Sequence, residues 1–389
     1  MTRLLNVIMA MMCCLAAMAQ SLEAQLDSLL LPRYNASAPG FALVIARGDT
    51  IIYERYRGMA DLEKATPISA ATLFNIASVS KQFTAVGVLQ LYNQGALDID
   101  MPMALYFPEY RHPLWQTVTA RQFMSHSSGI PDLRSSYSRD EKIYATDSTS
   151  IEYLSTVDSL KFAPGTAYDY INPTYTLLGS LIERRSGLEF EAYQSSQVFA
   201  RAGLVCDKDI EYFNPASQPS PGAHGYIPFE NQVADGNNAS RCYKDSEGRL
   251  WMKFDYGEET FFATRPDGGI YATARAMARW DSALLKGLLL PDSLLRMARS
   301  PHITVSGSPW CDYQNRPNTA YGLGWFIDTT PGRETKIYHT GDNGGFQAYL
   351  VSYPASGITV VMLENRNDLD RWTTQLAIER LLLSHGLIK

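Results

Sequence analysis

The sequence lacks the features that would indicate a nucleic-acid or membrane partner. Charged residues make up 19% of the 389 residues, the net charge is −6, and lysine and arginine form no basic run. A nucleic-acid surface needs clustered positive charge, so no nucleic acid is expected as a partner. No apolar stretch reaches the about 20 residues that a spanning helix needs, so we expect no stable membrane insertion.

Histidine and cysteine are scarce, and their spacing fits no metal site. The six histidines contain no His-x-x-x-His pair and the five cysteines no C-x-x-C pair. We therefore expect no metal and no cofactor. Beyond residue 19 the cysteines are Cys206, Cys242 and Cys311. One disulfide with a spare thiol and three buried thiols both fit this set.

The first 19 residues are typical of an export signal. Arg3 precedes an apolar run at 4–17, and the small-residue triplet at 17–19 offers a cleavage site. We expect a signal peptide at 1–19 and a mature protein in the periplasm or outside the cell. A lipid anchor through Cys13 or Cys14 ranks second, because methionines precede them where a small residue is expected.

Residues 20–389 are expected to form one large domain with strands at both ends. Strand-like runs occur at 41–46, 50–56, 322–327, 336–339, 345–353 and 357–363, and helical spacing at 22–31, 81–92, 174–185, 272–285 and 372–383. These patterns predict an α/β (α+β) sheet lobe from about 20–75 and 265–389. They also predict an inserted, mainly helical lobe at about 76–210 and an irregular insertion at about 215–265. The termini must meet in space for the end strands to share one sheet.

The sharpest local pattern is Ser78-Val79-Ser80-Lys81, at the start of an apolar helix. Three residues are nearly one helical turn, so the hydroxyl and the amine share a face. The helix N-terminus and burial both favour a neutral lysine, which can act as a base for the serine. The alternative is a serine N-cap followed by a solvated lysine.

A second pattern is Tyr170-Ile171-Asn172, which lies beyond Pro164-Gly165. The Tyr170 hydroxyl can relay a proton beside a cation, and the Asn172 amide can bond both Lys81 and a substrate carbonyl. Tyr313-Gln314-Asn315 matches equally well and is interpreted as a surface turn.

A third pattern, His339-Thr340-Gly341, falls on an expected strand beside Gly344-Gly345. Glycine allows a substrate backbone to approach closely, and the strand edge offers the N–H of Asp342 to an oxyanion.

In this order and spacing, the three patterns resemble the serine β-lactamase and penicillin-binding protein superfamily. They most resemble class C β-lactamases and the related esterases, DD-peptidases and D-aminopeptidases. The stretches at 123–131, 268–274, 321–325 and 340–350 add to the likeness. The resemblance implies an antiparallel sheet flanked by helices and an acyl-enzyme on Ser78, with Lys81 and Tyr170 moving protons. Asn172, His339, Thr340, Gly341 and Asp342 would bind the substrate or oxyanion. His126 matches a position interpreted as structural.

One departure bears on the substrate. Typical β-lactamases carry lysine where His339 stands, and that cation helps to hold the drug carboxylate. Histidine is mostly neutral near pH 7, whereas Arg366 or Arg371 offers a replacement charge. We therefore expect hydrolysis of an ester, an amide or a D-amino-acid peptide, ahead of a β-lactamase proper. A non-catalytic binder of cell-wall peptide is the third reading. The partner is a small molecule or peptide, and a monomer is favoured.

Overall fold

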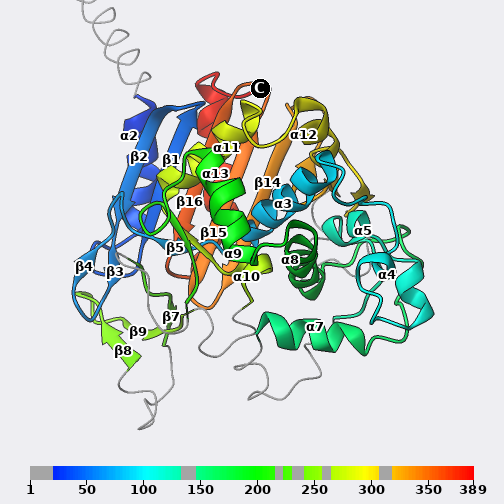
Figure 1. Cartoon of the computed structure of the whole chain (residues 1–389). Helices are drawn as coiled ribbons and strands as arrows, with labels where there is room; N and C mark the ends of the chain where they lie inside the picture. The colour runs from blue at the N-terminus through cyan, green and yellow to red at the C-terminus, as the bar shows by residue number, and fades with distance from the viewer. Residues whose placement is uncertain (1–20, 133–145, 215–221, 230–240, 256–263, 306–317) are drawn as a thin grey trace, which may run out of the picture.

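An eight-stranded antiparallel sheet forms the centre of one lobe (Figure 1). The computed structural model describes residues 21–132, 146–214, 222–229, 241–255, 264–305 and 318–389. Across the sheet, the strands are β11 (Ile303–Thr304), β12 (Thr319–Tyr321), β13 (Phe326–Asp328), β14 (Lys336–Asn343), β15 (Phe346–Tyr353), β16 (Ile358–Glu364), β1 (Phe41–Arg47) and β2 (Thr50–Arg57). The expected antiparallel α/β fold is confirmed.

The first and last parts of the chain meet in this sheet, as expected. β1 pairs with β16 from Phe41 opposite Glu364 to Arg47 opposite Ile358. Alternate residues of β1 face opposite layers, because successive side chains in a strand point to opposite sides. Leu43 packs in a core with α2 (Leu22–Leu30) and α13 (Arg371–Ser384), whereas Val44 joins the larger core on the other face.

The larger core contains most of the remaining helices. α11 (Ala274–Leu285) covers β16 and β1, and α3 (Lys81–Asn93) packs against α8 (Pro173–Ser186). Other helical segments are α4 (Met103–Tyr106), α5 (Ala120–Met124), α7 (Asp147–Ser155), α9 (Phe190–Tyr193), α10 (Arg265–Gly268), α12 (Asp292–Ala298) and the short turns η1 (Leu31–Arg33), η2 (Ala77–Ser80), η3 (Pro113–Gln116), η5 (Gln194–Phe199) and η6 (Ala200–Ala202).

Three small sheets accompany the eight-stranded one. β5 (Phe74–Asn75), β10 (Ile270–Ala272) and β6 (Ile210–Tyr212) form one, and β3 (Met59–Asp61) pairs with β4 (Thr66–Pro67). The third consists of β7 (Tyr226–Pro228), β9 (Leu250–Lys253) and β8 (Cys242–Lys244). The segment 215–265 is expected from its sequence to be irregular, but its described residues include the three strands of this third sheet. Strands of three or four residues are too short to show a clear alternation in sequence.

Other differences from the expectations have local causes. The run 322–327 is not one strand, because Gly322 N–H bonds to Trp325 C=O and Gly324 has φ +103° in the turn between β12 and β13. Cys206 and Cys242 are free thiols, and Cys311 and the 313–315 pattern lie outside the described residues.

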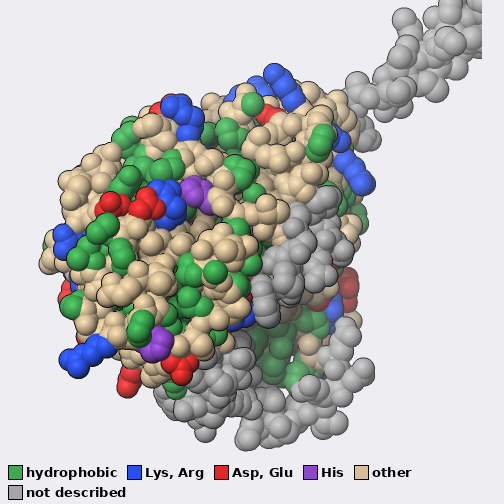
Figure 2. Space-filling model, turned by 90° about the vertical axis from the view of Figure 1, so that its right-hand side faces the viewer, with side chains coloured by type: hydrophobic (Ala, Val, Ile, Leu, Met, Phe, Trp, Pro, Cys, Tyr) green, Lys and Arg blue, Asp and Glu red, His purple; other side chains and the backbone are tan. Residues whose placement is uncertain are grey.

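On the face in Figure 2, charged side chains of both signs are scattered among other groups. No helix within the described ranges is long and apolar enough to cross a membrane.

A buried ion pair links α11, the end of α12 and the sheet. Arg299 lies 2.7 Å from Asp281, the two side chains are 7% and 1% exposed, and Asp281 accepts a further hydrogen bond from Thr359. We expect Arg299→Met to lower the free energy of unfolding by about 3 kcal/mol, because it leaves a buried carboxylate without its cation. Urea unfolding measures this loss.

The matched control is Arg296→Met, which breaks a pair with Asp292 whose side chains are 70% and 74% exposed. An exposed pair contributes at most about 1 kcal/mol. Equal losses for the two variants would contradict the role assigned to the buried pair.

Candidate active site

Ser78 lies in the tight turn η2, between β5 and α3. Its neighbours Ala77, Val79 and Ser80 are buried, whereas Ser78 is partly exposed. Ala77 has φ +45°, a left-handed conformation that is unfavourable for a residue with a Cβ. The turn therefore presents one hydroxyl to solvent on a strained and closely packed backbone.

Lys81 begins α3 and is 0% exposed. Its Nζ lies 3.1 Å from Ser78 Oγ and 2.8 Å from the backbone oxygen of Asp267. The helical spacing of three residues therefore brings the two side chains into contact, as the sequence predicts. The alternative of a solvated lysine is excluded by its burial.

Tyr170 lies beside Lys81. Lys81 Nζ is 5.0 Å from the centre of the Tyr170 ring and 5.5 Å from that of Tyr175, which begins the buried face of α8. The electron-rich ring faces partly compensate the lost hydration of the amine. Tyr175 is held in place because its hydroxyl donates to the Met124 carbonyl at 2.7 Å.

His126 holds the segment that carries Tyr170. Its Nδ1 accepts the Ile171 N–H at 3.2 Å, its carbonyl accepts the Asp169 N–H at 2.9 Å, and its ring lies 4.1 Å from that of Tyr170. Burial and the charge of Lys81 lower the pKa of His126 well below its usual value, so it stays neutral. The structural role expected for His126 agrees with these contacts.

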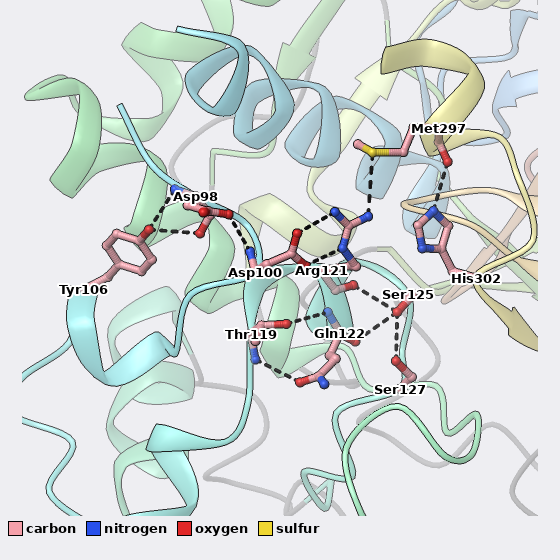
Figure 3. Close-up of polar contacts among 10 residues, drawn as sticks. All are labelled: Asp98, Asp100, Tyr106, Thr119, Arg121, Gln122, Ser125, Ser127, Met297 and His302. Atoms are coloured by element: carbon pink, nitrogen blue, oxygen red, sulfur yellow. Dashed lines mark hydrogen bonds and ion pairs between the residues drawn. The ribbon is translucent and has the colours of Figure 1, made fainter. Parts of the chain in front are cut away.

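The loop around His126 is fixed from α5 (Figure 3). Thr119 and Gln122 form a reciprocal capping box at the start of this helix. At its end, Ser125 Oγ donates to the Arg121 carbonyl at 2.9 Å and lies 2.9 Å from Ser127 Oγ. These contacts hold both neighbours of His126, which itself has φ +55°.

β14 passes directly behind the serine turn. A Cβ on Gly341 would lie 2.2 Å from the Ile76 carbonyl and 3.0 Å from Ala77 Cβ, so only glycine allows this approach. Thr340 is buried beside it, and Asp342 is exposed at the strand edge. Arg371 bonds both carboxylate oxygens of Asp342 at 2.9 Å and the Gly341 carbonyl at 3.1 Å.

His339 is 1% exposed and does not present its ring to solvent. Its Nδ1 lies 2.7 Å from the Thr340 carbonyl and its Nε2 lies 2.7 Å from the Tyr321 hydroxyl. A carbonyl only accepts, so Nδ1 carries the proton and Nε2 accepts from Tyr321. Burial, followed by the charge of Lys81, lowers the pKa of His339 to about 3. His339 is therefore neutral at ordinary pH.

Asn172 differs in part from the expectation. It precedes α8, and its Oδ1 is buried and makes no hydrogen bond within the described part of the chain. The expected bond from Lys81 to this oxygen is therefore not made. The acceptor for Lys81 is the Asp267 carbonyl, a backbone group in α10 for which no side-chain pattern signals a role.

The residues predicted from the three patterns thus come together, although they are far apart in sequence. Ser78, Lys81, Tyr170 and the strand at 339–342 share one site, while Arg366 is bound to Asp368 at 2.6 Å. Sequence reasoning missed the contacts of Asp267 and Tyr321. Tyr321 belongs to a stretch that carried family likeness, but nothing in that stretch indicates a bond to His339.

An antiparallel sheet with a helical lobe inserted into it, and a buried lysine bonded to a partly exposed serine, define a serine hydrolase of the β-lactamase and transpeptidase type. The model of the family described as Beta-lactamase matches residues 18–382. The chain belongs to this family.

Several curated proteins are similar over most of the chain. Penicillin-binding protein 4* of Bacillus subtilis is 24% identical over 337 residues, which cover 84% of this chain and 68% of that protein. A β-lactamase of Yersinia enterocolitica is 25% identical over 359 residues, covering 85% and 82%. A D-aminopeptidase of Gluconobacter oxydans is 23% identical over 354 residues, covering 90% of this chain and 60% of the relative.

Solved structures share the fold. The octameric penicillin-binding protein homologue from Pyrococcus abyssi superimposes with a TM-score of 0.75 at 22% identity, covering 93% of this chain and 77% of that one. The penicillin-binding protein from Bacillus halodurans gives a TM-score of 0.73 at 26% identity, covering 92% and 99%.

The low pKa of His339 predicts a pH dependence of stability. In the unfolded chain a histidine takes up a proton below about pH 6.5, whereas folded His339 does so only near pH 3. Stability therefore falls as the pH is lowered through this window. We expect His339→Gln to make the fall shallower, by up to about 1.4 kcal/mol per pH unit.

Urea unfolding at several pH values between 3.5 and 7 measures the slopes. His385→Gln, at an exposed histidine, controls for the loss of one titrating group from the unfolded chain. If the two variants have the same slope, the neutral and buried state of His339 is wrong.

Proposed function

We propose that the protein hydrolyses an ester, an amide or a D-amino-acid peptide through an acyl-enzyme on Ser78. The observation that carries this proposal is the 3.1 Å contact between Lys81 Nζ and the partly exposed Ser78 Oγ. A buried amine next to a serine hydroxyl is the arrangement that general-base activation of a nucleophile requires.

In the acylation step, Ser78 Oγ attacks the substrate carbonyl and its proton passes to Lys81, whose amine must first have given up its own proton. The N–H groups of Ser78 and Asp342 hold the oxyanion of the tetrahedral intermediate. When the carbon–nitrogen or carbon–oxygen bond to the leaving group breaks, that group receives a proton from Lys81 through Tyr170. Water then repeats the sequence on the acyl-enzyme and releases the acid and Ser78.

The other named residues would support this chemistry. Gly341 admits the strand to the serine turn, and Thr340 and Asn172 border the acyl group. We assign His339 a supporting role, because its ring is buried and both of its nitrogens are bonded. In this role His339 fixes the position of β14 through its hydrogen bond with Tyr321, and it contributes no positive charge to the site.

The choice of substrate rests on charge. A β-lactam presents a carboxylate, yet His339 is neutral. The guanidinium of Arg371 is bound by Asp342, and that of Arg366 by Asp368. Two curated relatives are named a D-aminopeptidase and a β-lactamase, which keeps both substrate classes in view. The charges favour the peptide, amide or ester over the β-lactam.

We further propose that residues 1–19 are an export signal and that the mature chain acts in the periplasm or outside the cell. Its partner is a small molecule or peptide, without nucleic acid. A monomer is favoured, while the octameric homologue from Pyrococcus abyssi makes the oligomeric state worth measuring.

Ser78→Ala tests the nucleophile. After brief exposure to p-nitrophenyl acetate, wild type is expected to gain the mass of one acetyl group, and the variant to gain none. Intact-protein mass spectrometry reads the adduct, and Ser155→Ala, at an exposed serine at the end of α7, is the control for the reagent's selectivity. An adduct that persists in Ser78→Ala would assign the nucleophile elsewhere, and no adduct with no turnover of any substrate would favour a non-catalytic binder.

A comparison of kcat/KM on three substrate classes tests the preference. We expect the kcat/KM of a D-amino-acid anilide or a short-chain ester to exceed that of a penicillin by at least about tenfold, because no free positive charge is assigned to the penicillin carboxylate. A factor of ten corresponds to about 1.4 kcal/mol of transition-state stabilisation. A penicillin that leads by decades would make the protein a β-lactamase proper.

A further inference from the structure

Asn75 is the last residue of β5, three positions before Ser78, and its side chain is fully engaged. It is 1% exposed. Its Oδ1 accepts the Ala77 N–H at 3.0 Å, and its Nδ2 lies 3.2 Å from the Gly268 carbonyl and 3.3 Å from the Ile270 carbonyl. One buried amide therefore connects the serine turn with the segment that contains Gly268 and Ile270.

The bond to Ala77 bears on the nucleophile. Ala77 has φ +45°, which an alanine adopts only when surrounding contacts hold it there. Its N–H is tied back to Asn75 inside the turn, and the next residue is Ser78. If this bond is lost, the backbone can relax, which changes the direction of both Ser78 Oγ and the Ser78 N–H.

The bonds to Gly268 and Ile270 bear on the base. The segment 266–270 packs against the serine turn and α3, and its Asp267 carbonyl accepts the hydrogen bond from Lys81. Two further bonds hold that segment. Thr84, in α3, donates to the Pro266 carbonyl at 2.6 Å, and Ser80 Oγ, at the end of η2, accepts the Ile270 N–H at 3.2 Å. Asn75 adds two hydrogen bonds to this segment, at Gly268 and Ile270, directly after Asp267.

We propose that Asn75 is a positioning residue for the acylation step, which it serves by setting the Ser78 turn and the Asp267 carbonyl that aims Lys81. The proposal rests on the proposed function of Ser78. It predicts that loss of the Asn75 amide slows the formation of the acyl-enzyme while substrate binding changes little. Asn75 contacts neither reacting atom, so its whole effect passes through its neighbours.

The chain offers a matched control in Asn365, which is 0% exposed. Its side chain makes the same set of bonds, accepting the Gly40 N–H at 2.7 Å and donating to the Met59 and His224 carbonyls at 3.0 and 2.9 Å. None of these three partners belongs to the serine turn. Asn75→Leu and Asn365→Leu therefore remove equivalent buried amides at different places.

The experiment measures acylation by p-nitrophenyl acetate, with the saturating rate and the half-saturating concentration determined separately. Both variants are assayed at a temperature well below the midpoint of their thermal unfolding. We expect Asn75→Leu to lower the saturating rate by about 100-fold, the range seen when one oriented hydrogen bond is lost from a catalytic site. Its half-saturating concentration should change less than threefold, and Asn365→Leu should stay within threefold of wild type in both.

Asn75→Asp supplies a second test should Asn75→Leu not fold. The Asp variant keeps the acceptor for Ala77, but its carboxylate faces the carbonyls of Gly268 and Ile270, to which only a protonated oxygen can donate. We expect its acylation rate, divided by that of wild type at the same pH, to rise at least fivefold between pH 8 and pH 5.

The outcomes separate the two proposals. A wild-type protein that forms no adduct would overturn the function proposed for Ser78, and the role of Asn75 with it. A wild type that is acylated, with Asn75→Leu within threefold of it or slowed no more than Asn365→Leu, would overturn the role of Asn75 alone. A flat ratio across pH for Asn75→Asp would do the same.

Discussion

The buried Lys81 amine is the group around which the rest of the site is arranged. An amine without solvent needs polar partners, because an unpaired charge or donor in the interior is costly. Lys81 finds these in Ser78 Oγ and the Asp267 carbonyl, with the faces of Tyr170 and Tyr175 nearby. The requirement draws together the start of α3, the short helix α10 and the segment before α8. A partly exposed hydroxyl then lies within reach of a base that is shielded from water.

The two histidines nearest this amine remain neutral for the same reason. Burial and the charge of Lys81 lower the pKa of both His126 and His339. Each imidazole ring instead makes hydrogen bonds that hold neighbouring segments in place. His126 holds the backbone on both sides of Tyr170, and His339 connects its strand to Tyr321. Neither histidine therefore adds a positive charge beside Lys81, and the site lacks the charge that would attract a carboxylate at the histidine position.

Backbone conformation does as much as side-chain chemistry in presenting Ser78. Left-handed residues occur at Ala77, directly before Ser78, and at His126, whose ring lies beside that of Tyr170. Hydrogen bonds hold both places: Asn75 accepts the Ala77 N–H, and Ser125 and Ser127, on either side of His126, bond to each other. Gly341 allows a strand to lie against the turn, where any Cβ would collide with the Ile76 carbonyl. Precision at the site thus comes from tight packing between segments that are far apart in sequence.

The sequence by itself determined the elements and the chemical groups. Helical spacing placed Lys81 one turn from Ser78, runs of β-forming residues identified β1, β2, β15 and β16, and three short patterns in order indicated the family. These are local properties, since they depend on residues within a turn or a strand of one another. The contacts of Asp267 and Tyr321, the burial of His339 and the pairing of Arg371 with Asp342 were decided only by the tertiary structure. Each depends on a partner that is at least 18 residues away in the chain, as for Tyr321 and His339, or on a backbone carbonyl that no side-chain pattern marks. Which distant groups meet is set by how the sheet and the helical lobe pack, and that packing has no local signature.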